Sequence, residues 1–91
     1  MSKGMKNIIV IDDESNWRRE LTLILEKLGC INVIQCKTTL MAKEKIKRLN
    51  ANIDLIITDL LFPGLEDGNA INFIHEINIT DPHIPVIVVS Q

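Results

Sequence analysis

The sequence predicts an α/β fold, a doubly wound parallel sheet flanked by helices, and three observations carry this prediction. Short apolar runs alternate with helical patterns along the chain. Three runs, at residues 7–11, 53–58 and 85–90, lack the polar alternation of a strand with one face in water. No internal repeat, low-complexity tract or linker interrupts the alternation. With 91 residues, the chain is expected to form one small domain.

The first strand is expected at residues 7–11, and a helix follows that Ser15 caps and Gly29 ends. The run at 31–36 has polar interruptions, as expected of an edge strand. The buried face of the first helix is expected to consist of four residues at helical spacing: Leu21, Ile24, Leu25 and Leu28.

A second helix is expected to begin at a cap formed by Thr38 or Thr39, with its lysines on a solvated face. A strand at 53–58, a helix between Gly68 and Asp81, and a strand at 85–90 complete the order βαβαβαβ. The inward residues of the second helix are expected to be Leu40, Met41, Ile46 and Leu49, and those of the third Ile71, Phe73, Ile74 and Ile77.

Composition narrows the function classes. Ten basic and twelve acidic residues leave a formal charge of −2, which argues against nucleic-acid binding through the whole surface. Cys30 and Cys36 are expected to be reduced thiols of a cytoplasmic protein. No apolar run reaches the about 18 residues that span a bilayer, and no signal peptide is visible, so no membrane partner is expected.

Carboxylates follow two of the predicted strands. Asp12 and Asp13 come directly after the first strand, and Asp59 follows the third apolar run. Taken alone, the acidic pair is explained by helix-dipole complementation, and Asp59 is explained by turn formation. If these strands are neighbours, however, the three side chains meet at the carboxyl ends of the sheet. Two like charges about 5 Å apart repel by roughly 3 kcal/mol at a dielectric of 20, which calls for a cation or for raised pKa values. Oxygen ligands favour Mg²⁺.

The stretches "NIIVIDDE" (7–14) and "DLIITDLLFPG" (54–64) together resemble the receiver domain of two-component response regulators. The resemblance runs from about residue 6 to residue 90. Its motifs are the acidic pair after the first strand, Asp59 after the third with Pro63 four residues on, Gly68 opening a helix, and the hydroxyl of Ser90 ending the last strand.

The resemblance implies a flavodoxin-like topology with strand order 2-1-3-4, and a role for each site residue. Asp59 would be the phosphoacceptor, and its partner a sensor histidine kinase or a phosphotransfer protein. Asp12, Asp13, Asp59 and the backbone carbonyl of Leu61 would hold Mg²⁺, and Ser90 would be the switch hydroxyl. Enzymatic activity would be limited to self-phosphorylation, from phosphohistidine or a small phosphodonor, and autodephosphorylation.

The sequence departs from the family pattern in two places. The stretch "PGLEDG" has one residue more between its proline and the later glycine than the family usually has. The family's domain continues after the fourth strand through a helix, a fifth strand bearing a lysine, and a last helix. We therefore expect residues 1–91 to be a truncated receiver domain, with 1–5 as a flexible leader.

An open edge at strand 85–90 and an uncovered sheet face predict a homodimer or higher oligomer. The alternative function is a phosphorylation-independent interaction or oligomerisation module derived from a receiver fold, which the missing lysine favours and the three aspartates oppose. An aspartate-nucleophile phosphohydrolase is set aside, because Leu61 stands where a second aspartate would be needed.

Overall fold

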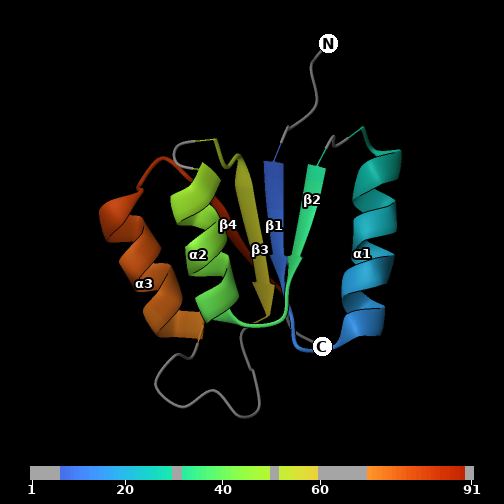
Figure 1. The fold of residues 1–91 in the computed structure, drawn as a ribbon, viewed down its shortest axis with the longest axis horizontal. Helices are drawn as coiled ribbons and strands as arrows, with labels where there is room; N and C mark the ends of the chain where they lie inside the picture. The colour runs from blue at the N-terminus through green and yellow to red at the C-terminus, as the bar shows by residue number, and fades with distance from the viewer. Residues whose placement is uncertain (1–6, 30–31, 50–51, 60–69, 90–91) are drawn as a thin grey trace.

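The computed structural model describes residues 7–29, 32–49, 52–59 and 70–89. Within them four parallel strands form one sheet in the order β2-β1-β3-β4, which confirms the predicted fold and strand order (Figure 1). The elements in chain order are β1 (Asn7–Ile11), α1 (Ser15–Lys27), β2 (Asn32–Cys36), α2 (Thr39–Leu49), β3 (Leu55–Asp59), α3 (Ala70–Thr80) and β4 (Val86–Val89).

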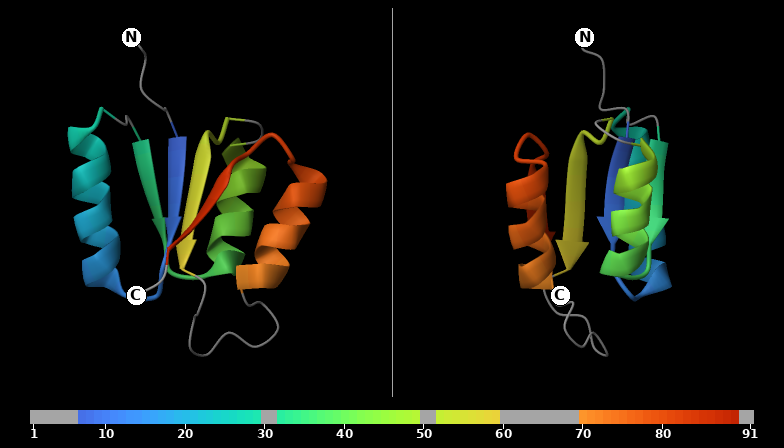
Figure 2. Two further views of the ribbon diagram at one scale, coloured as in Figure 1. Left: turned by 180° about the vertical axis from the view of Figure 1, so that it is seen from behind. Right: turned by 60° about the vertical axis from the view of Figure 1, so that its left-hand side comes forward.

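Helices cover both faces of the sheet, α1 on one side and α2 with α3 on the other (Figure 2). This explains why the central strands are apolar without alternation. In β1, Ile9 and Ile11 pack toward α2 and α3, whereas Ile8 and Val10 pack toward Leu25 of α1. These four residues are each at most 1% exposed. A strand buried on both faces needs an apolar residue at every position.

The two cores differ in size. The core under α2 and α3 contains Ile9, Ile11, Cys36, Ala42, Ile46, Ile53, Ile56, Phe73, Ile77 and Ile84. The core under α1 contains Ile8, Val10, Leu25, Leu55 and Ile57. Because most of the buried aliphatic residues lie under α2 and α3, that side of the sheet carries most of the hydrophobic stabilisation.

The rotation of two helices differs from the expectation. In α1 Leu25 is buried and Leu21 half-buried, but Ile24 and Leu28 are 55% and 73% exposed, so their expected burial is wrong. Thr22 is buried instead, and its Oγ1 donates to the carbonyl of Arg18 at 2.7 Å. Several apolar stripes at helical spacing coexist on one helix, and contacts with β2 and β1 select which stripe is buried.

A similar shift occurs in α2. Leu40 and Met41 are exposed, contrary to expectation, while Ala42 and Ile46 face the core as expected of an inward stripe three to four residues apart. The Met41 N–H donates to Thr38 Oγ1 at 3.1 Å, so Thr38 caps the helix, and Thr39, which is buried, is the first helical residue.

The ends of α1 are formed by different means. Gly29 adopts a φ of 98° and its N–H donates to the Glu26 carbonyl at 3.0 Å, which confirms it as the helix stop. The expectation that Ser15 caps the start is wrong, since Ser15 lies inside the helix and Glu14 occupies the cap position without a side-chain cap bond. Asp12 Oδ1 instead accepts the Glu14 N–H at 2.9 Å.

At the β4 edge, Ile87 and Val88 remain 48% and 44% exposed. The uncovered face is narrower than expected, because Leu55 and Ile57 of β3 are only 7% and 6% exposed within the core under α1, which Val89 joins. None of the helices in the described part of the chain has the length and apolar character that a membrane crossing requires.

Candidate metal centre

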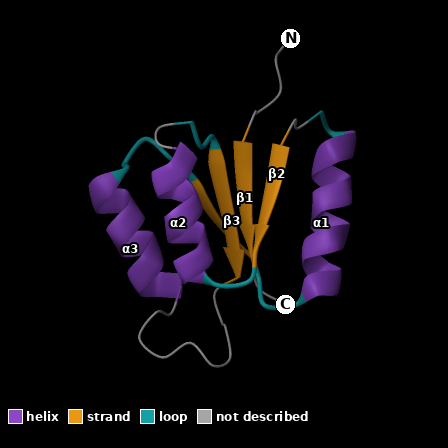
Figure 3. Cartoon of the chain, viewed as in Figure 1, coloured by secondary structure: helices purple, strands orange, loops and turns teal. Residues whose placement is uncertain are grey.

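Pairing of β1 with β3 brings three carboxylates to one end of the sheet. The register pairs Ile11 with Thr58, so the residue after β1 lies beside the last residue of β3. Carboxylate oxygens of Asp12, Asp13 and Asp59 lie within 4.8 Å of one another. The turns from β1 to α1 and from β2 to α2 lie at this same end (Figure 3). The expected convergence of the three side chains is therefore found.

The cluster is held at the boundary between core and solvent. Asp12 and Asp59 are 1% and 8% exposed, and Asp13 is the more accessible member. Burial raises the pKa of Asp12; the Glu14 N–H opposes this, while the carboxylates of Asp59 and Asp13 raise it further. Ionising the buried carboxylate thus costs free energy that a bound cation would recover.

Backbone hydrogen bonds hold the turn that carries Asp12 and Asp13. The Asp12 N–H donates to the Cys36 carbonyl at 3.1 Å, which ties the end of β1 to the end of β2. The Asp12 carbonyl accepts a hydrogen bond from Nη1 of Arg18. The adjoining Thr58 is fully buried, and its Oγ1 donates to the Asp59 carbonyl at 3.0 Å. The backbone positions that carry these carboxylates are therefore constrained by hydrogen bonds.

Capping explains only part of this arrangement. Asp12 does accept the Glu14 N–H, so helix initiation is one of its roles. That role does not account for Asp59, which comes from another strand. Three carboxylates at up to 4.8 Å repel in pairs, at about 3.5 kcal/mol gross for two unit charges at a dielectric of 20. The oxygen-only donor set fits a small hard cation such as Mg²⁺.

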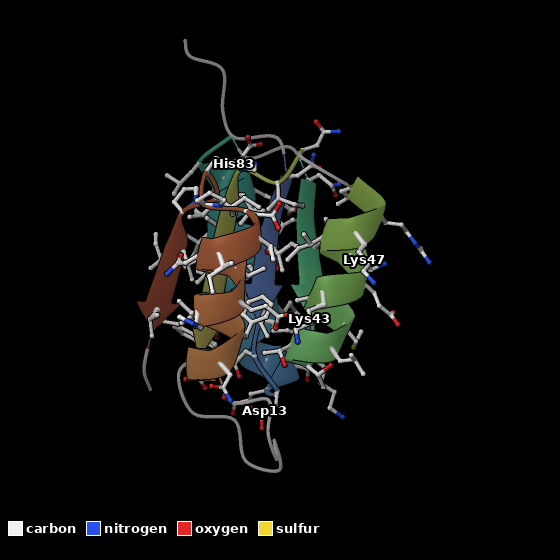
Figure 4. The ribbon with its side chains drawn as sticks, turned by 90° about the vertical axis from the view of Figure 1, so that its left-hand side faces the viewer. Asp13, Lys43, Lys47 and His83 are labelled. Carbon is white, nitrogen blue, oxygen red and sulfur yellow. The ribbon has the colours of Figure 1, made fainter. Side chains whose placement is uncertain are left out.

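Leu61 and Ser90, the other two predicted site residues, lie outside the described residues, as do Pro63, Gly68 and Cys30. The two histidines are exposed loop or helix residues. His83 lies at the end of the molecule opposite Asp13 (Figure 4). Trp17 is half-buried one turn into α1, close in sequence to the aspartates.

Two residues near the cluster were not predicted as part of it. Arg18 contacts Asp12 through the backbone, which a basic residue early in a helix does not reveal. Cys36 is a free, fully buried thiol, as its expected structural role requires. Burial raises the pKa of Cys36, and the charges of Lys45 and Arg18 act in the opposite direction.

A concave region lies between α2 and α3, with a volume of about 450 Å³. Lys43 bridges it with an ion pair from Nζ to Glu76 Oε1 at 2.8 Å (Figure 4). Both side chains are about half exposed, so the pair contributes at most about 1 kcal/mol. The lysines of α2 were expected on a solvated face, and one of them, Lys43, thus joins α2 to α3.

The model of the response regulator receiver domain matches residues 8–91. The chain is 36% identical over 84 residues to protein-glutamate methylesterase/protein-glutamine glutaminase 1 of Rhizobium johnstonii, covering 91% of this chain and 22% of that protein. It is 35% identical over 86 residues to the KDP operon transcriptional regulatory protein KdpE of Escherichia coli, covering 94% and 35%. The chain thus spans about a fifth to a third of these relatives.

Among solved structures, the beryllofluoride-activated NtrC4 receiver domain dimer superposes with a TM-score of 0.76 at 35% identity, over 90% of this chain and 63% of that one. This likeness over 90% of the chain supports the receiver-domain fold.

Proposed function

The chain belongs to the response regulator receiver domains, and on that premise we propose that Asp59 accepts a phosphoryl group, with Mg²⁺, in two-component signalling. One observation carries the proposal: Asp12, Asp13 and Asp59 converge within 4.8 Å at the carboxyl ends of the two central strands. The donor would be a sensor histidine kinase or a phosphotransfer protein.

In the proposed reaction an oxygen of the Asp59 carboxylate attacks the phosphorus of a phosphohistidine. The P–N bond breaks, its electrons remain on the imidazole nitrogen, and an aspartyl phosphate forms. Asp12 and Asp13 would hold Mg²⁺ together with Asp59, and the metal would neutralise the oxygens of the phosphoryl group during transfer. Asp59 suits the role of acceptor because β3 is buried along its length and fixes the position of this carboxylate.

We propose two further roles by analogy with the family. The backbone carbonyl of Leu61 would complete the protein ligands of Mg²⁺, and the Ser90 hydroxyl would bond the phosphoryl group. The domain would work in the cytoplasm without direct contact with nucleic acid or membrane, and the net charge of −2 is in keeping with that.

Acetyl phosphate tests the acceptor directly. The purified chain is incubated with this small phosphodonor and Mg²⁺, and its intact mass is measured beside Asp59→Asn and a control, Asp54→Asn. Asp54 is exposed and directly precedes β3, so it lies at the opposite end of the strand. We expect one phosphoryl adduct on the wild type and the control, and none on Asp59→Asn. An adduct that persists in Asp59→Asn would refute the assignment.

We also propose that the domain self-associates along β4. Exposed Ile87 and Val88 on a strand paired only with β3 in the described sheet support this, since an apolar edge favours pairing with another chain. The NtrC4 receiver domain is described as a dimer. Sedimentation of the wild type and of Ile87→Lys tests the proposal: the variant should shift toward monomer, and identical masses would contradict it.

The same experiments separate the second candidate, a phosphorylation-independent interaction module, which the exposed β4 edge favours. Association through β4 without any phosphoryl adduct on the wild type would favour that function over phosphoacceptance. An adduct on Asp59 that alters the sedimentation profile would instead link the two properties.

A further inference from the structure

Arg18 reaches back from α1 to the residue that ends β1. Its Nη1 donates to the Asp12 carbonyl. The backbone of Arg18 is itself fixed, because its N–H donates to the Glu14 carbonyl at 3.1 Å and its carbonyl accepts from Thr22 Oγ1 at 2.7 Å. The side chain therefore spans a turn whose two ends are both anchored.

The Asp12 carbonyl belongs to the peptide that joins Asp12 to Asp13. A peptide is planar, so a hydrogen bond that holds its oxygen also sets the direction in which Asp13 leaves the strand. The Asp12 N–H is held by the Cys36 carbonyl, and Asp12 Oδ1 accepts the Glu14 N–H. Arg18 thus supplies the contact on the side of the turn that leads to Asp13.

Arg18 acts on this turn through the backbone. Its Nη1 donates to the backbone carbonyl of Asp12. Nε of Arg18 is buried and makes no hydrogen bond to the part of the chain that the structure describes. Its desolvation offsets the stabilisation from the Nη1 bond, so the residue should influence the site more than the global stability.

From these contacts we propose that Arg18 is a positioning residue, which holds the Asp12–Asp13 peptide so that both carboxylates bind one Mg²⁺. This rests on the proposed function. The direction in which Mg²⁺ affinity changes when Arg18 is replaced distinguishes a positioning role from a purely electrostatic one. A nearby positive charge repels Mg²⁺, so losing the charge alone would tighten binding. Losing the peptide contact would weaken it, as loss of supporting contacts around metal ligands does by about tenfold or more.

The test compares Arg18→Gln with Arg19→Gln, a neighbour on the same helix that is exposed. The Mg²⁺ dissociation constant is measured by calorimetry and by Trp17 fluorescence, with urea unfolding in EDTA to verify folding. We expect about tenfold weaker binding for Arg18→Gln. For Arg19→Gln we expect a change within about twofold, toward tighter binding and suppressed by salt.

Arg18→Lys keeps the charge and one donor group, and should recover part of the lost affinity. Lysine lacks the planar donor fork that holds the peptide, so some loss of Mg²⁺ affinity relative to the wild type is expected. If Arg18→Gln does not fold, Arg18→Lys decides the matter, because unchanged affinity would show that this geometry does not matter and would overturn the proposal. Equal or tighter binding in folded Arg18→Gln would overturn it as well, while leaving the proposed function intact. A wild type that shows no Mg²⁺ response in either measurement would overturn both.

Discussion

The two ends of the sheet show opposite ways of placing polar groups beside a buried core. At the amino ends of the strands, Asn7 is the centre of a network: its Nδ2 donates to the Asn52 carbonyl at 2.8 Å, and its Oδ1 accepts from Asn32 Nδ2 at 3.0 Å. Its backbone N–H donates to Asp54 Oδ2 at 3.0 Å. At the carboxyl ends, Asp12, Asp13 and Asp59 bring like charges together.

This difference separates a structural cluster from a chemical one. In the Asn7 network, donors and acceptors match, so folding itself satisfies it. The aspartate cluster combines acceptors of one charge, and its electrostatic free energy improves when a cation binds. Substitutions at the two ends should therefore change stability in opposite directions.

The largest expected effect is stabilisation by Mg²⁺. At a concentration 100 times its dissociation constant, a ligand that binds only the folded state raises the free energy of unfolding by about 2.7 kcal/mol. Urea unfolding with Mg²⁺ and with EDTA measures this difference. It should vanish in Asp13→Asn and persist in Asn7→Ala. Equal stabilisation of wild type and Asp13→Asn would show that the cluster is not the binding site.

Asn7→Ala should lower the free energy of unfolding by about 1–2 kcal/mol, because it removes two side-chain hydrogen bonds at about 0.5–1.5 kcal/mol each. Asn32→Ala removes one of them and should cost about half as much. Urea unfolding monitored by circular dichroism provides both values. An Asn7→Ala chain as stable as the wild type would mean that this end of the sheet does not contribute as described.

Asp12→Asn should change stability in the other direction. In EDTA at pH 7 we expect the free energy of unfolding to rise by about 1 kcal/mol, a fraction of the gross repulsion that the substitution removes. The amide oxygen still accepts the Glu14 N–H, so the start of α1 is preserved. The Mg²⁺ response should be lost at the same time. A destabilised variant in EDTA would show that the cluster is a structural element like the Asn7 network.

The smallest expected effect is the pH dependence of the difference in unfolding free energy between Asp12→Asn and the wild type. The folded-state pKa of Asp12 lies above its ordinary value of 3.8, so the folded state binds more protons between the two values. The contribution of Asp12 to stability is therefore full below the ordinary value and is lost as the pH rises through the folded pKa. Urea midpoints in EDTA should show Asp12→Asn gaining over the wild type from pH 4 upward. A difference in urea midpoint that instead grows as the pH falls would contradict the prediction.

Local chemistry made several features predictable. Residues 8–11 of β1 and 55–57 of β3 are apolar at every position because both faces of the sheet are covered, and that pattern is visible in a short window of sequence. Thr38 and Gly29 act within one helical turn of their own positions. The convergence of Asp12 with Asp59 required the order of the strands, which the resemblance to receiver domains supplied.

Other features depend on contacts between distant segments. Ile24, Leu28, Leu40 and Met41 have the spacing of buried residues and are nevertheless exposed, because the rotation of each helix is chosen by the strands it packs against. The guanidinium of Arg18 contacts the Asp12 carbonyl only after α1 has formed and β1 has ended at its place beside β2.

The sequence by itself determined the alternation of strands and helices, the apolar cores of the central strands and the placement of an aspartate at the carboxyl end of each of two strands. These follow from backbone propensity and hydrophobic period, which act over a few residues. Only the tertiary structure decided which helix faces are buried, how far Ile57 and Ile87 are covered, and how Arg18 supports the carboxylates. Those outcomes are sums of packing and electrostatic energies between segments that meet only in the folded chain.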